Sequence, residues 1–245
     1  MKRRMFLFAI IVLLTASAGA QEIGRGVITA LEGEAEKRQA PEADWLEAAL
    51  EMDIYSKEMV RTLPESFAEI SLSRGSVIRL APKTTVNMNK LYEEAEDKIV
   101  TNIEVAEGEI WGNVNKTGED ELFSVDSTAV SSSIIGTVFR IDTGEDGTLI
   151  KVYRGNVEVS GKPAPSKDEP AADQPREIEG PTEVEGPREV TLEEWTVIVR
   201  EMMELKVDAQ GRIVRMDSIN TMSADEQSAW VKWNQKRDMK SPVKH

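Results

Sequence analysis

The chain has 245 residues, no cysteine, and 44 acidic against 30 basic residues, which gives a formal net charge of −14. The missing cysteines exclude thiol catalysis, cysteine zinc sites and iron–sulfur clusters, and the only histidine is the last residue, His245. A Ser-His-Asp triad or a histidine metal site is therefore not expected, and the acidity argues against nucleic acid and anionic membrane surfaces as partners.

The first twenty residues have the pattern of a secretory signal peptide. Three cations at 2–4 precede ten apolar residues at 5–14, and small residues at 18–20 form a cleavage site. Ten apolar residues are too few to span a bilayer comfortably, so we predict cleavage after Ala20 and export to the periplasm or beyond. No integral membrane span is expected after cleavage. An uncleaved membrane anchor is the alternative.

Between residues 27 and 160 the chain contains several segments in which every second residue is apolar. A glycine follows each of these segments. Glu32-Gly33, Arg74-Gly75, Glu107-Gly108 and Arg154-Gly155 each follow such a segment. Because glycine accepts the positive φ of a tight turn, the pattern predicts a series of β-hairpins. The glycines are irregularly spaced, which favours a compact all-β domain over a regular repeat architecture.

The stretch 129–141 is the most distinctive part of this region. Thr137, Phe139 and Ile141 share one face of a predicted strand. Gly136 lies between two β-branched residues, where a glycine indicates a bend or the close approach of another backbone.

Several short motifs follow one another between residues 27 and 159. The most characteristic are Gly136-Thr137-Val138-Phe139 and the segment 152–159. Others are Arg61-Thr62, Ser66-Phe67-Ala68, Leu72, Gly75-Ser76, Leu80, Thr84, Glu107-Gly108-Glu109 and Trp111. In their order, these motifs resemble the FecR-type periplasmic domain. The resemblance implies a mainly β, solenoid-like or sandwich-like fold. It also implies structural rather than ligand-binding roles for the signature residues Gly75, Gly108, Gly136, Thr137, Phe139, Gly155 and Val157.

The remaining chain divides into two parts after the β-domain, which we place at 21–161. Residues 162–190 contain six prolines and eight acidic residues with almost no large apolar ones, which predicts an extended acidic linker. Residues 191–245 predict a helix, a hairpin and a second helix. Thr191 with Glu194, and Ser223 with Glu226, form the two capping boxes, and a hairpin is expected around residues 209–211.

Candidate sites are few, and neither a cofactor nor a metal is expected. The carboxylates at 142–147 could form a calcium loop, but Asp146-Gly147 between two predicted strands favours a hairpin turn. Trp230 and Trp233 share a helix face and could form a sugar- or peptide-binding platform. Such a pair more often docks a terminal helix onto the body of the protein.

The resemblance implies protein recognition. In the FecR family this domain typically lies on the periplasmic side of a transmembrane regulator that responds to a TonB-dependent outer-membrane receptor. We expect a non-enzymatic, secreted module that recognises an envelope protein, without the cytoplasmic sigma-regulating segment. A cell-wall or polysaccharide binding module that uses Trp230 and Trp233 is the alternative.

Overall fold

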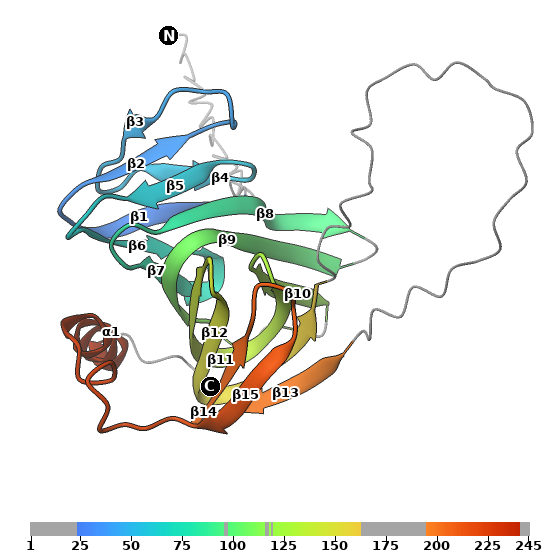
Figure 1. The fold of residues 1–245 in the computed structure, drawn as a ribbon. Helices are drawn as coiled ribbons and strands as arrows, with labels where there is room; N and C mark the ends of the chain where they lie inside the picture. Colours follow the sequence, from blue (N-terminus) through green and yellow to red (C-terminus); the bar gives the residue numbers. More distant parts are fainter. Residues whose placement is uncertain (1–23, 96–97, 116–117, 119, 163–194, 241–245) are drawn as a thin grey trace, which may run out of the picture.

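The computed structural model describes residues 24–95, 98–115, 118, 120–162 and 195–240. These residues form fifteen strands, a short 3-10 turn and one α-helix, so the expectation of a mainly β fold is confirmed (Figure 1). The predicted signal peptide, the Thr191 cap and the predicted linker beyond Lys162 lie outside the described residues.

All the strands belong to one hydrogen-bonded sheet, which bends into two arms. The first arm contains, in spatial order, β4 (Asp53–Tyr55), β1 (Arg25–Glu32), β6 (Phe67–Ser71), β7 (Val77–Leu80), the end of β9 (Lys98–Asn113), the end of β11 (Val130–Gly144), the start of β12 (Gly147–Gly161), β14 (Met203–Val207) and β15 (Ile213–Ser218). The second arm contains β3 (Leu46–Glu47), β2 (Ala35–Arg38), β5 (Met59–Thr62), β8 (Thr85–Ala95), β10 (Glu121–Asp126), β13 (Thr196–Arg200) and the other halves of β9, β11 and β12.

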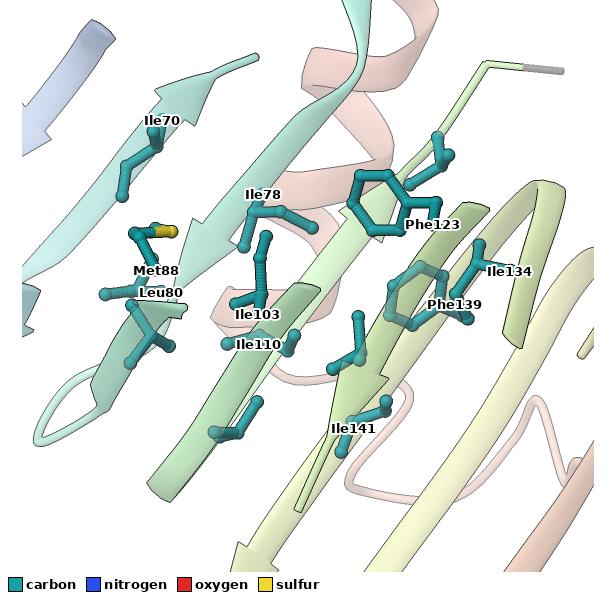
Figure 2. Packing of buried hydrophobic residues seen from close by; sticks show 14 of the residues in the cluster. Ile70, Ile78, Leu80, Met88, Ile103, Ile110, Phe123, Ile134, Phe139 and Ile141 are labelled. Carbon is teal, nitrogen blue, oxygen red and sulfur yellow. The ribbon is translucent and has the colours of Figure 1, made fainter. Parts of the chain in front are cut away.

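The hydrophobic core lies between the two arms. Ile70, Leu80 and Phe139 reach it from the first arm, and Met88 and Ile103 reach it from the second (Figure 2). Because side chains alternate along a strand, each arm presents one apolar face to this core and a second face to the outside.

A row of residues with positive φ marks the bend between the arms. They are Gly33, Glu65, Lys83, Gly108, Gly136, Gly155 and Met202. Each lies where the chain crosses from one arm to the other, either between two strands or inside β9, β11 or β12. Backbone hydrogen bonds join neighbouring crossings to one another. Leu63 N donates to Glu34 O at 3.0 Å, and Ala81 N donates to Glu109 O at 2.9 Å.

Three of the four expected hairpin turns are wrong. Arg74-Gly75 does join the antiparallel pair β6 and β7. Gly33, Gly108 and Gly155 instead lie at the crossings, and the last two sit inside continuous strands. A positive φ can reverse a chain or bend it, and the local sequence does not distinguish these outcomes. The hairpin predicted at Asp146-Gly147 is confirmed, because β11 and β12 pair up to Gly144 and Gly147.

The helix expected after the Thr191 cap is also wrong in its described part. Residues 196–207 contain β13 and β14, and both strands pair with β12. The run Thr196-Val197-Ile198-Val199 is β-branched, and pairing with β12 outweighs the helical spacing of its apolar residues. The hairpin around residues 209–211 is confirmed by the pairing of β14 with β15. The second expected helix is present as α1 (Ala229–Lys240), but its predicted start is wrong, because Ser223 and Glu226 lie in the turns before it.

We expect Gly108→Ala to destabilise the protein by about 3 kcal/mol, measured by urea unfolding. Its φ is +91°, and an added Cβ would lie 2.7 Å from the Thr84 Cα and 2.8 Å from the Lys83 carbonyl oxygen. Gly144→Ala is the control, because its Cβ would meet nothing within 4 Å. That change should cost less than about 0.5 kcal/mol. Equal losses for the two variants would contradict the role given to the crossing.

Candidate functional site

A row of side chains crosses the outer face of the first arm. Strand register places Glu69 opposite Arg79, then Trp111, Arg140, Lys151 and Glu204 on successive neighbouring strands. These six residues, which we call the charged row, point away from the core because their strand neighbours point into it. Five of the six carry charges, and all are largely buried.

The C-terminal segment, residues 219–240, covers this row. At one end Arg140 donates two hydrogen bonds of 2.8 Å to Asp225. Lys151 donates to Asp225 at 2.7 Å and to Glu226 at 2.8 Å. The turn before α1 therefore places two carboxylates beside the neighbouring cations Arg140 and Lys151.

The helix itself contacts the other end of the row. Asp238 accepts hydrogen bonds from Arg79 at 2.7 Å and from the Trp111 indole N–H at 3.0 Å. Arg237 donates to Glu69 at 2.8 and 2.9 Å, and Glu69 also accepts from Arg79 at 2.6 Å. In Figure 1, α1 accordingly lies beside β6 and β7.

Aromatic rings fill the space between these two ionic ends. The rings of Phe67 and Trp230 stack with centroids 5.4 Å apart, and Trp233 stacks 5.7 Å from each of them. Trp111 stacks on Tyr153 at 4.5 Å. Trp230 is only 7% exposed, and the Trp233 indole donates to Glu32 at 2.7 Å. The two tryptophans considered as a platform thus lie against the sheet.

The seven signature residues lie elsewhere. Gly75 is in the β6–β7 turn, and Gly108, Gly136 and Gly155 are in the row of crossings. Phe139 and Val157 are in the core. Thr137 is buried, and its hydroxyl donates to the Asn156 carbonyl oxygen at 3.0 Å beside the Gly136 crossing.

The residues that bind the C-terminal segment were not among the predicted site residues. Arg79, Arg140 and Lys151 each interrupt an apolar strand, which indicates a side chain that faces away from the core. That signal does not identify the partners, because Arg79 and Asp238 are 159 residues apart in the chain.

The surrounding charges fix the protonation of the site. Burial alone would raise the pKa of Glu69, but hydrogen bonds from Arg237, Arg79 and Thr29 lower it to about 2. Hydrogen bonds from Arg140 lower the pKa of Asp225. Burial raises this pKa and a hydrogen bond from Lys151 lowers it further, so that it falls to about 2.

Tyr153 remains a hydrogen-bond donor at this site. Burial, followed by the negative charge of Glu226, raises its pKa, so the phenol stays protonated. It donates to Glu226 at 3.1 Å. The site therefore holds paired charges and donors that suit the binding of a polypeptide segment.

Within the described residues, no group of three or more histidine, cysteine or acidic residues is placed to hold a metal ion. In the same part of the chain, no helix has the length and apolar character needed to cross a membrane.

Residues 58–158 match the family model described as FecR protein. These residues form a FecR domain. The domain begins just before β5, ends within β12, and supplies five of the six residues of the charged row, from Glu69 to Lys151. FecR domains are periplasmic in members of the family, and the family is regulatory rather than enzymatic. The FecR domain supports a regulatory or interaction role for this chain.

Two crystal structures of proteins from Parabacteroides distasonis ATCC 8503, each described as a candidate anti-sigma factor, are similar to this FecR-domain protein. The first is 16% identical with a TM-score of 0.46, over 71% of this chain and 64% of the other. The second is 15% identical with the same TM-score, over 76% and 74%. This chain thus spans less than two thirds of the first of these proteins. No curated protein matches it.

We expect Arg140→Ala to accelerate amide hydrogen exchange in α1 roughly a hundredfold, because it leaves Asp225 and Glu109 without their main cationic partner. Arg212→Ala is the matched control. Arg212 pairs with Asp208 in the β14–β15 turn, and its side chain is 74% exposed, so exchange in α1 should not change. Unchanged exchange in the Arg140 variant would contradict the role of the charged row.

We also expect stability to fall as the pH decreases from about 4.5 towards 2. The pKa of Glu69 is lower in the folded protein, so its contribution is complete above its ordinary pKa of 4.5 and is lost as the folded carboxylate becomes protonated. Asp225 acts in the same direction from its ordinary pKa of 3.8. Urea unfolding between pH 7 and pH 2.5 tests this. Glu69→Gln should lower stability at pH 7 and flatten the acid dependence, and an unchanged slope would contradict the assignment.

Proposed function

We propose that this FecR-domain protein is a non-enzymatic protein-recognition module of the bacterial envelope. The observation that carries the proposal is that the outer face of the FecR domain holds a polypeptide segment. It does so through the charged row and the aromatic ring of Phe67, which all lie on the surface of one arm.

The arrangement suits recognition of a protein better than recognition of a small molecule. The carboxylate partners Asp225 and Asp238 are thirteen residues apart in the chain, and the aromatic stack lies between them. A ligand that satisfies both ends of the row must be an extended surface such as a helix. The family's regulatory character supports the same class of function.

The proposal includes a location. Residues 1–20 have the pattern of an export signal, and FecR domains are periplasmic in the family. We propose that the domain is released into the periplasm as a separate protein and meets an envelope protein there.

The proposal predicts that a photo-crosslinking residue at Arg215 captures an envelope protein in living cells. Arg215 is exposed on β15 and pairs with Glu204 at the end of the charged row. Glu158, which is exposed on the outside of the second arm, is the control position and should crosslink much less.

The same experiment tests the location. Osmotic shock should release a protein that begins at Gln21. Retention in the cytoplasm, or equal crosslinking from the two positions, would contradict the proposal. Sedimentation with isolated cell-wall glycan, lost in Trp233→Ala, would support the glycan-binding alternative.

A further inference from the structure

The main core is complete without the C-terminal segment. Among the described residues, no member of the core between the two arms comes from 219–240. Trp230 and Val231 instead form a smaller cluster with Ala81, Trp111 and Val138 on the outer face. Removal of the segment would expose that face and leave the core between the arms closed.

The charged row can also lose the segment without leaving an unpaired cation. Arg79 has Glu69 at 2.6 Å, Arg140 has Glu109 at 3.0 Å, and Lys151 has Glu204 at 3.3 Å, all from neighbouring strands. The severe cost of a buried charge without a partner therefore does not oppose release. The desolvation cost of burying Glu226, and of partly burying Asp238, offsets much of what their ion pairs gain, so the contact is selective rather than strong.

The chemistry of the contact is specific. The segment directs the acidic pair Asp225-Glu226, the stacked Trp230, and Asp238 towards the sheet. Lys232, Gln235, Lys236 and Met239 are exposed on the opposite side of α1. The face thus binds carboxylates at two ends, an aromatic ring between them and the Arg237 cation on Glu69, whereas Lys232 and Lys236 point away from it.

We infer that the outer face of the first arm is a docking site for acidic, aromatic helical segments, and that residues 219–240 occupy it reversibly. A partner protein with a helix of the same chemistry displaces this segment when it binds. The identity of the partner as an envelope protein rests on the proposed function. The docking chemistry rests on the contacts above.

The test uses the full chain with a specific protease site in place of residues 220–222. This position suits cleavage because Met222 is 82% exposed. The folded protein is cut, the released segment is removed by gel filtration, and a fluorescent peptide of residues 223–240 is added. We expect saturable binding by anisotropy, and at least tenfold weaker binding to the uncut protein, whose own segment competes.

Peptide variants test the chemistry without changing the domain. A peptide with Asp225→Asn, Glu226→Gln and Asp238→Asn should bind at least tenfold more weakly. The matched control carries Lys232→Ala and Lys236→Ala, which alter exposed residues of the same helix, and it should bind as the native peptide does.

Four results would overturn the inference. The first is that the β-sheet circular dichroism signal is lost when the segment is removed, and the second is that the folded cut protein fails to release the segment or fails to bind the peptide. The third is that the peptide binds equally to the cut and the uncut protein. The fourth is that the acidic and the neutralised peptides bind equally well. Crosslinking from Arg215 does not depend on this peptide, so the proposed function could survive these results, and failure of both experiments would remove it as well.

Discussion

The bend of the sheet at its positive-φ residues is the constraint on which the rest of the structure depends. In β9, β11 and β12 the core-facing residues are five positions apart across the bend: Val105 and Ile110, Ile134 and Phe139, Val152 and Val157. An odd separation means that the alternation of the strand is inverted at Gly108, Gly136 and Gly155. This inversion allows both halves of each strand to direct apolar side chains into the same core. It also fixes Arg140 and Lys151 on the outer face.

The charged row gains specificity more than strength from its burial. A pair such as Lys151 and Glu226 loses hydration when it is buried, and the ion pair repays that loss only when the geometry is maintained. Substitution of one partner costs binding free energy because the other charge is left buried without that partner, whereas a segment that supplies every partner binds. This asymmetry distinguishes a matching surface from a mismatched one, as recognition of a particular protein requires.

The sequence predicts the β-domain well and the site poorly, for different physical reasons. Alternation and glycine placement are local signals, and Gly136 was correctly expected at a bend. Three other crossings lie at Glu65, Lys83 and Met202. Their φ is positive, but Glu, Lys and Met are not residue types that indicate a positive φ. The strand β13 was predicted to be a helix because the spacing of its apolar residues fits both a helix and a strand. Pairing with the edge of β12 makes it a strand. The ion pairs of the row depend on strand order across the whole sheet, which no local pattern contains.

The described part of the chain after the predicted linker adds three strands to the sheet that contains the FecR domain. The Gly161 N–H donates to the Trp195 carbonyl oxygen at 3.2 Å, so the chain returns beside the strand that it left. From there β13 extends the second arm, and β14 and β15 extend the first. Ile219 N then donates to Met202 O at 2.9 Å, which fixes the start of the C-terminal segment against the sheet. The same strands that lengthen the charged row by Glu204 therefore deliver Asp225 to it. In this way the sheet holds the segment next to its site at high effective concentration, and the partner that we propose would have to bind the face more tightly than it would if the segment were absent.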